Sequence, residues 1–320
     1  MFSKRKKKIF LWILPGIGLL AGVWELGDFV YSRMVQNAVR RFESSIDRDE
    51  QGVQTGARSY TLAGNDTALL LVHGFNDTPR TFERMAPALH RQGFTVRAIR
   101  LPGFGVPVDQ MHQCTCEQWV QTLLDNAHEL RDQKKQVIVV GHSLGGAVTL
   151  GAITRSPELF DAAVLLAPAV DVANNRSPLL PTRVWRRLGD LLLQFSNVYQ
   201  SPYDRNDCRD PEYRNPEYKY PFSTRNIVQQ TFRLMDQNLP AAESIKMPVL
   251  MILSRDDRVT DWVAAEKYFG RIGSADKQLK FYDESGHALA VDYDWHNITA
   301  DILEFAHSRY GHPSAENGDE

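Results

Sequence analysis

The sequence predicts an α/β fold with a mostly parallel sheet and helices on both of its faces. First, beyond about residue 51, short apolar runs alternate with amphipathic stretches, which is typical of strand, helix and strand in a parallel sheet. Second, polar groups suited to catalysis follow several of the apolar runs directly. Third, 320 residues with 43% hydrophobic and 24% charged side chains are enough for one large α/β domain or two small ones, with a sizeable core.

The expected elements follow one another through a main domain at residues 51–310. We expect strands at Ala68–Val72, Phe94–Ile99, Val137–Val140, Ala162–Ala167, Val249–Leu253 and Leu279–Tyr282, and helices at Arg80–Arg91, Glu117–Leu130, Leu144–Arg155, Trp262–Phe269 and Asp294–Ser308. Prolines and tyrosines interrupt the alternation between about residues 171 and 240, together with helical pieces at Val184–Phe195 and Thr224–Asn238. We expect this segment to be an insert that forms a cap or lid over the sheet. The polar residues 311–320 predict a disordered tail.

Residues 1–50 form a separate N-terminal region. A basic cluster at residues 4–8 precedes an uncharged stretch from Ile9 to Trp24, and apolar residues then recur at helical spacing as far as Phe42. The uncharged stretch predicts a membrane-anchor helix, because flanking aromatic residues and lysines can extend a short span to the interfaces. The residues after it predict a helical stalk. A cleaved signal peptide is the alternative, but no convincing small-x-small cleavage site follows.

The charge pattern predicts where such a chain would lie. The basic cluster belongs on the cytoplasmic side of a single-pass anchor, so the main domain is expected on the periplasmic side of a bacterial inner membrane. Asn76-Asp77-Thr78 is a glycosylation sequon. It lies beside a loop that we expect at the candidate active site described below, and a glycan there would obstruct that site. This favours a bacterial envelope over a eukaryotic secretory compartment. A net charge of −2 does not indicate a nucleic-acid partner.

Ser143 is the candidate nucleophile. It is the centre of Gly141-His142-Ser143-Leu144-Gly145, which follows an expected strand and precedes an expected helix, the context of a nucleophile elbow. The flanking glycines are needed because so sharp a turn leaves no space for side chains. A hydroxyl is a poor nucleophile at neutral pH, so it needs a base that is held in one tautomer by a carboxylate.

His287 is the expected base and Asp257 the expected carboxylate. Each follows an expected strand, so both should lie at the carboxyl edge of the sheet, where α/β folds build their sites. The chain order of serine, aspartate and histidine also fits enzymes with a nucleophile elbow. His296, on a helix face, and His142, which would point away from the serine, are alternatives for the base. Asp256 is the alternative carboxylate, because two adjacent aspartates cannot both face one imidazole.

A tetrahedral intermediate needs two N–H donors for its oxyanion. The backbone N–H of Leu144, directly after the nucleophile, is expected to supply one. The other is expected from Phe75 in the loop His73-Gly74-Phe75-Asn76, which follows the first expected strand. We expect His73 to shape this loop through hydrogen bonds, since a second base is not needed.

Together these segments resemble the α/β-hydrolase superfamily, and within it the branch of monoacylglycerol lipases, carboxylesterases and S33-like serine aminopeptidases. The resemblance covers about residues 58–310 and rests on Leu69–Phe75, Arg100–Gly105, Gly141–Gly146, Asp257–Val259 and Gly286-His287. It implies an α/β-hydrolase fold and hydrolysis through an acyl-enzyme. It also implies Asp257 as the acid, because this branch places the acid two residues before the position of Val259. Phe104 departs from the branch, whose members usually carry histidine there, but the position looks structural.

The favoured function is therefore hydrolysis of a carboxylic ester. An anchor next to the site suggests lipid-like esters, as for a carboxylesterase or a monoacylglycerol or lysophospholipid lipase. A serine peptidase or amidase with the same triad is the alternative, and a membrane-tethered binding protein without activity is another.

No cofactor and no metal is expected. The three cysteines, Cys114, Cys116 and Cys208, lack a zinc-site pattern. They are expected to be buried or idle thiols, with a bridge from Cys208 to one of the other two as an alternative in an oxidising compartment.

Overall fold

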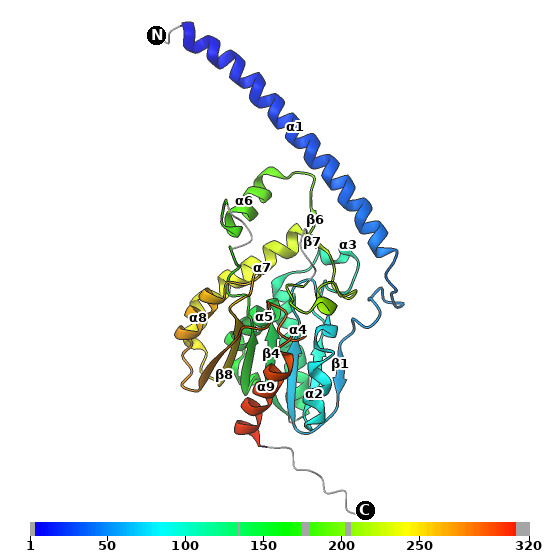
Figure 1. Ribbon diagram of the computed structural model, residues 1–320, viewed down its shortest axis with the longest axis vertical. Helices are drawn as coiled ribbons and strands as arrows, with labels where there is room; N and C mark the ends of the chain where they lie inside the picture. The colour runs from blue at the N-terminus through cyan, green and yellow to red at the C-terminus, as the bar shows by residue number, and fades with distance from the viewer. Residues whose placement is uncertain (1–3, 134, 175–178, 202–205, 312–320) are drawn as a thin grey trace, which may run out of the picture.

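A twisted central sheet organises the protein (Figure 1). The computed structural model describes residues 4–133, 135–174, 179–201 and 206–311, with side chains from residue 18 onward. Within these ranges a seven-stranded sheet has the order β1-β3-β2-β4-β5-β8-β9, and all neighbouring strands are parallel except β1 and β3. The strands are β1 (Tyr60–Leu62), β2 (Thr67–Val72), β3 (Thr95–Ile99), β4 (Gln136–His142), β5 (Ala162–Leu166), β8 (Val249–Ser254) and β9 (Lys277–Tyr282).

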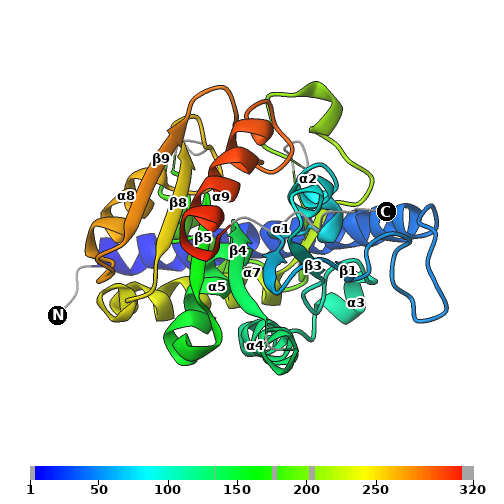
Figure 2. The same cartoon turned by 90° about the horizontal axis from the view of Figure 1, so that it is seen from below.

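Helices cover both faces of this sheet (Figure 2). The helices α2 (Met85–Arg91) and α9 (Trp295–Tyr310) pack on one face. The other face is covered by α4 (Cys116–Asp132), α5 (Leu144–Arg155), α7 (Arg225–Asn238) and α8 (Trp262–Arg271). The remaining elements are α1 (Lys4–Glu43), α3 (Val108–Met111), α6 (Thr182–Leu192), the paired short strands β6 (Val198–Gln200) and β7 (Phe222–Thr224), and 3-10 turns at Pro79–Phe82, Pro157–Leu159, Pro211–Tyr213 and Leu239–Ser244.

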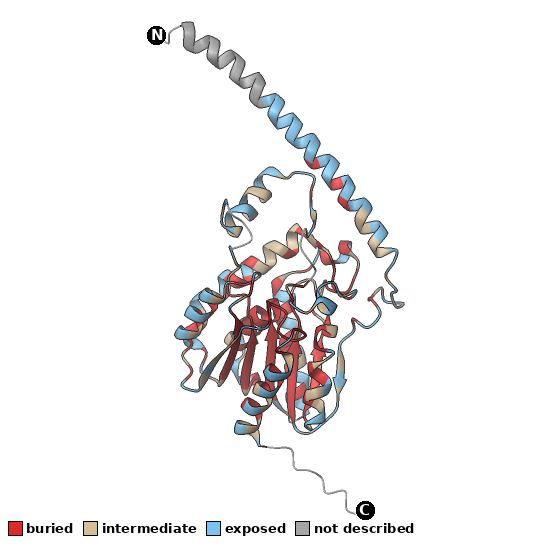
Figure 3. Ribbon diagram, viewed as in Figure 1, coloured by how far each residue is buried: buried red, intermediate tan, exposed pale blue. Residues whose placement is uncertain are grey.

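The central strands are buried on both faces, which explains their continuous apolar sequence (Figure 3). Successive side chains of a strand point to opposite faces of the sheet. In β2, Leu69 and Leu71 therefore join the apolar cluster of α2 and α9, whereas Leu70 and Val72 join the cluster of α4 and α5. All four side chains are completely buried. The predicted mostly parallel sheet with helices on both faces is confirmed.

Some elements differ from the prediction in instructive ways. The predicted helix Arg80–Arg91 is divided into a 3-10 turn at Pro79–Phe82 and α2. Pro87 has no N–H to donate to the preceding turn, so it is tolerated only near a helix start, and α2 begins two residues before it. The strands β1, β6 and β7 were not predicted, because three residues are too few to show a periodic pattern.

The β5–β8 connection, residues 167–248, contains the predicted insert and has two parts. Its helix α7 belongs to the layer on the sheet, since Ile227, Leu234 and Met235 are buried in the main core against α4 and α5. The helix α6, by contrast, has no buried residue and lies between the domain and α1 (Figures 1 and 3).

The N-terminal residues form one continuous helix, α1, from Lys4 to Glu43, which extends well beyond the domain (Figure 1). It contacts the β5–β8 connection through Asp28 and Ser32, which are buried. Among the described residues, no helix combines the length and the apolar character needed to cross a bilayer. The predicted helical character is therefore observed, whereas the predicted membrane-spanning helix is not confirmed.

The three cysteines are buried free thiols. The alternative of a bridge to Cys208 is wrong, because Cys208 packs with Ala288 and Val291 whereas Cys114 and Cys116 lie in the main core. The predicted disordered tail lies outside the described residues from residue 312 onward.

Candidate active site

Ser143 lies on a sharp turn between β4 and α5. Its φ of 56° and ψ of −117° are sparsely populated for a residue with a side chain, which stores strain at this position. The turn requires glycine on both sides. A Cβ on Gly141 would lie 2.4 Å from Thr149 Oγ1, and one on Gly145 would lie 2.1 Å from the carbonyl oxygen of Val72. The pentapeptide can thus make this turn at the end of β4 because the residues two before and two after the serine have no side chains.

The structure brings Ser143, His287 and Asp257 together. Ser143 Oγ lies 2.8 Å from His287 Nε2, and His287 Nδ1 lies 2.7 Å from Asp257 Oδ2. All three side chains are buried. They come from the turns after β4, β9 and β8, so the parallel sheet delivers them to one edge.

Asp257 is held by its own loop. The backbone N–H groups of Val259 and Thr260 donate to Oδ1 at 2.7 and 2.8 Å, and Thr260 Oγ1 donates to Oδ2 at 2.7 Å. Sequence reasoning missed Thr260, although an aspartate three residues before a threonine is a common pattern for such local bonds. With these donors in place, Asp257 can face the imidazole in only one orientation.

The electrostatics of the site favour an ionised carboxylate. Burial by itself raises the pKa of Asp257, but the charge and hydrogen bond of His287, with the bonds from Thr260 and Val259, lower it overall. An ionised carboxylate can only accept, so His287 donates its Nδ1–H to Asp257. His287 Nε2 is then left to accept the hydroxyl proton of Ser143, the arrangement that prepares a serine to attack an acyl carbonyl.

Two backbone N–H groups are available beside Ser143. Leu144 is the first residue of α5, so its N–H has no acceptor within the helix. Among the described residues, the N–H of Phe75 also has no hydrogen-bond acceptor. The loop of Phe75 lies against the nucleophile, because a Cβ on Gly74 would lie 3.2 Å from Ser143 Cβ. Both predicted oxyanion donors therefore border the serine.

The three alternative side chains lie elsewhere. His142 is behind the imidazole of His287, where its Nε2 lies 2.9 Å from the His287 carbonyl oxygen, and burial lowers its pKa to about 3. His296 is exposed on α9 and stacks on Trp295. The carboxylate of Asp256 accepts from Arg209 at 3.0 Å. Among the described residues, none of the three side chains is hydrogen-bonded to Ser143.

His73 shapes the loop that carries Phe75. Its Nε2 accepts the N–H of Leu101 at 3.0 Å, and its Nδ1 donates to the carbonyl oxygen of Gly74 at 2.9 Å. Burial lowers the pKa of His73 to about 4, so the imidazole is neutral at pH 7. Phe104 packs edge-on against His73 and is buried, which agrees with a structural role for that position.

The β5–β8 connection holds the same loop from its other side, a contact that sequence reasoning missed. Lys219 Nζ lies 3.2 Å from Asp77 Oδ2, and both side chains are buried. Asn76 has a φ of 52° and donates its Nδ2 to the carbonyl oxygen of Phe222 at 2.8 Å. No local pattern could have revealed this contact, since its partners are more than 140 residues apart in the chain.

No metal site accompanies these residues in the described ranges. There, no group of three or more His, Cys, Asp or Glu side chains is arranged to hold a metal ion.

Comparisons with known proteins place the chain in a family. The model of the family "Serine aminopeptidase, S33" matches residues 64–294, more than half of the chain. A thermostable monoacylglycerol lipase from a Bacillus species is 27% identical over 257 residues, which are 80% of this chain and 97% of that protein. A carboxylesterase from Bacillus subtilis is 24% identical over 253 residues, which are 78% of this chain and 95% of that protein.

Solved structures show the same fold. A structure from a study of two metagenome-derived lipolytic enzymes has a TM-score of 0.72 and 23% identity, covering 80% of this chain and 99% of that one. The monoacylglycerol lipase of Paleococcus ferrophilus has a TM-score of 0.67 and 20% identity, covering 78% and 98%. The chain is a hydrolase of the lipase and esterase type, and it belongs to the serine aminopeptidase S33 family of α/β hydrolases.

Proposed function

We propose that this chain is a serine hydrolase of lipid-like carboxylic esters, with Ser143 as nucleophile, His287 as base and Asp257 as the carboxylate that orients the base. One observation carries the proposal: the continuous hydrogen-bonded chain from Ser143 Oγ through both ring nitrogens of His287 to Asp257. Apolar side chains could fill the same buried space with a smaller desolvation penalty. Three hydrogen-bonded polar side chains at this place therefore support a catalytic role.

In the acylation step, Ser143 Oγ forms a bond to the acyl carbon while its proton passes to His287 Nε2. Asp257 stabilises the imidazolium, and the N–H groups of Phe75 and Leu144 bind the developing oxyanion. The tetrahedral intermediate then collapses. The bond to the alcohol breaks, and His287 returns the proton to the leaving alkoxide.

In the deacylation step, a water molecule takes the place of the alcohol. His287 accepts a proton from the water, the hydroxide attacks the acyl-enzyme, and the second intermediate releases the carboxylic acid and restores Ser143. This sequence uses only groups of the chain and water.

The ester class is supported by the relatives, whose names describe a monoacylglycerol lipase and a carboxylesterase. Kinetics on p-nitrophenyl esters of short and long acyl chains, compared with aminoacyl nitroanilides, test it. We expect turnover of the esters that is lost in Ser143→Ala, with preference for the longer chains. Faster turnover of the nitroanilides would show a peptidase instead.

In this proposal the β5–β8 connection is a cap that selects the substrate, and α1 brings the domain to a lipid surface.

Exposed apolar side chains on α1 support its contact with a lipid surface. They recur at steps of three and four, so they share one face: Leu19, Val23, Leu26, Val30 and Met34. Residues two apart on a helix lie nearly opposite each other, so this face points away from the buried Asp28 and Ser32. If residues 9–24 were to cross the bilayer, the basic cluster at residues 4–8 would stay on the cytoplasmic side and the catalytic domain would lie in the periplasm.

Fractionation of cells that express the full chain tests the membrane contact. We expect the protein in the membrane fraction and expect removal of residues 2–22 to release it. Val30→Glu should weaken binding to anionic vesicles, whereas Gln36→Glu, which adds the same charge on another face of α1, should weaken it less. A full chain that is already found in the soluble fraction would refute this part of the proposal.

A further inference from the structure

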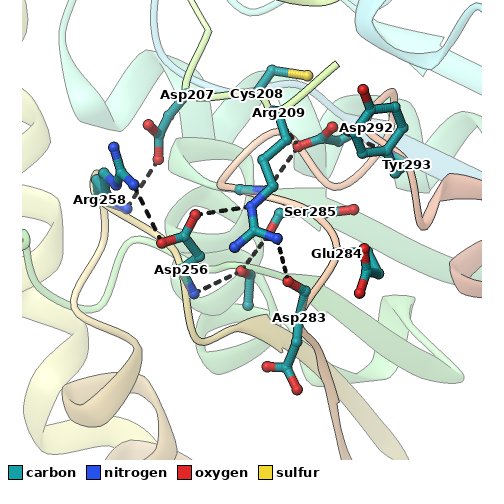
Figure 4. Close-up of polar contacts among 12 residues, drawn as sticks. Asp207, Cys208, Arg209, Asp256, Arg258, Asp283, Glu284, Ser285, Asp292 and Tyr293 are labelled. Atoms are coloured by element: carbon teal, nitrogen blue, oxygen red, sulfur yellow. Dashed lines mark hydrogen bonds and ion pairs between the residues drawn. The ribbon is translucent and has the colours of Figure 1, made fainter.

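A short stretch of the β5–β8 connection, residues 207–210, lies between the loop that carries Asp257 and the loop that carries His287 (Figure 4). The contacts reach both neighbours of Asp257. Arg209 Nε donates to the Asp256 carboxylate at 3.0 Å, and the N–H of Arg258 donates to Asp207 Oδ2 at 2.9 Å. The two residues that flank Asp257 in the chain are therefore both held by the same stretch.

The contacts also reach both neighbours of His287. The N–H of Ala288 donates to the carbonyl oxygen of Asp207 at 3.1 Å. On the other side, a Cβ on Gly286 would lie 2.7 Å from that same oxygen, so only glycine permits the approach. Arg209 adds a third contact, since its Nη1 donates to the carbonyl oxygen of Asp283 at 2.7 Å, at the start of the same loop.

Asp292 links the stretch of residues 207–210 to the loop that carries His287. It is completely buried, and each of its oxygens accepts two backbone N–H groups. Oδ2 accepts from Gly286 at 2.7 Å and from Arg209 at 2.9 Å, so one oxygen atom links the histidine loop to the connection. A buried carboxylate with four donors is held in one position, because losing it would leave those N–H groups without acceptors.

We propose that Arg209 and Asp292 are positioning residues that set the distance between Asp257 and His287, so that the β5–β8 connection is part of the catalytic machinery as well as its cover. The inference rests on the proposed function. Neither residue is hydrogen-bonded to a triad side chain. Arg209 acts on Asp256 and Asp292 acts on Gly286, each one residue from a triad member, and Arg209 also holds Asp283, four residues before His287. A change here should therefore alter the orientation of the base and carboxylate while leaving substrate contacts intact.

Kinetics of full-length variants on one p-nitrophenyl ester test this role. Displacements of about 1 Å in a reacting geometry can cost about 100-fold in rate. We expect Asp292→Asn to lower kcat by about 100-fold and Arg209→Met by about 10-fold, with KM within about twofold of wild type. Arg209→Lys should restore most of kcat, because it keeps the charge beside Asp256. The rate of labelling by a fluorophosphonate should fall by the same factor as kcat.

A variant from the loop of Asp257 is the control. Arg255 pairs with Asp283 at 3.1 Å on the exposed side of the cluster, and its side chain forms no ion pair with Asp292 or Asp256. Arg255→Met removes the same charge as Arg209→Met from a neighbouring position, and we expect kcat to stay within about twofold of wild type.

The outcomes separate this inference from the proposed function. If wild type is labelled and Arg209→Met loses no more activity than Arg255→Met, the positioning role is wrong while the proposed function stands. If wild type is neither labelled nor active, both are wrong. Should Asp292→Asn fail to fold, as judged by its thermal transition, the comparison of Arg209→Met with Arg209→Lys decides.

Discussion

Two segments of the β5–β8 connection, residues 206–224 (the fastened part) and the helix α6, differ in how they are attached. Residues 206–224 are fastened to the loops of Asp257, His287 and Phe75, and several of their side chains are buried, among them Cys208, Lys219 and Phe222. The helix α6 has no buried residue. It contacts α7 through partly exposed side chains, such as Arg183 with Asp236 at 2.7 Å, and α1 holds its last residue and the segment that follows. There, Trp24 Nε1 donates to the Leu192 carbonyl oxygen at 2.8 Å, and Asp28 accepts the N–H of Phe195 at 2.7 Å.

This difference separates two requirements of a hydrolase. The catalytic groups need a fixed geometry, and the fastened part supplies it through buried polar contacts whose loss is expensive. The selection of substrate needs a surface that can vary, and in our proposal α6 supplies it, because every side chain of this helix is at least partly exposed. Changes in the fastened part should therefore reduce both stability and kcat, whereas changes in α6 should act on KM.

Breaking the ion pair between Lys219 and Asp77, beside the loop that carries Phe75, should have the largest effect on stability. Lys219→Met leaves the buried carboxylate of Asp77 without its charge partner, which costs about 3 kcal/mol in the free energy of unfolding. Urea denaturation measures this loss, and kcat should fall with it because the loop carries Phe75. The double variant Asp77→Asn with Lys219→Met should recover much of the stability. A loss below about 1 kcal/mol for the single variant would show that the fastened part is not stabilised by this pair.

Lowering the pH should reduce the free energy of unfolding through His73, which lies in the loop that carries Phe75. The pKa of this buried imidazole is lowered from 6.5 to about 4, so the unfolded chain binds a proton in that range that the folded chain does not. The free energy of unfolding must therefore fall as the pH drops from about 6.5 towards 4, by about 1 to 2 kcal/mol at pH 5. In His73→Gln we expect a shallower fall in urea denaturation across these pH values. Replacing the exposed His296 with glutamine should leave the slope unchanged, and an equal slope for His73→Gln would contradict the assignment.

Substitution on α6 should have the smallest effect on stability. Leu191 is 69% exposed, so Leu191→Ser should change the free energy of unfolding by less than about 0.5 kcal/mol. If α6 contacts long acyl chains, KM for a long-chain ester should rise by about threefold while KM for a short-chain ester stays the same. Val263→Ser, an exposed position on α8, is the control. A change in kcat instead of KM would place α6 with the fastened part.

The sequence allowed the strands of the sheet and the serine turn to be predicted because their signals are local. Apolar runs mark β2, β4 and β8, and glycines flank Ser143 within a few residues. The preference for Asp257 over Asp256 came from family resemblance, and the physical reason is the set of donors from Val259 and Thr260.

The contacts around the triad could not be predicted in this way. Arg209 meets Asp256 and Lys219 meets Asp77 across long stretches of chain, and each partner looks like an ordinary charged residue in its own segment. Only the folded arrangement shows that these charges lie beside catalytic loops. Helical spacing predicted α1 as a helix, but its exposed apolar face was not predicted, since the orientation of that face away from the domain depends on the contacts of Asp28.

Covalent labelling by a fluorophosphonate tests the central claim, the triad, most directly. The hydrogen bonds from Ser143 through His287 to Asp257 predict rapid labelling of the wild-type chain at Ser143, identified by mass spectrometry of the modified peptide. Ser143→Ala should not be labelled, and His287→Ala and Asp257→Asn should be labelled slower by about 100-fold or more. Labelling that persists in Ser143→Ala, or a wild-type rate no faster than that of His287→Ala, would contradict the account.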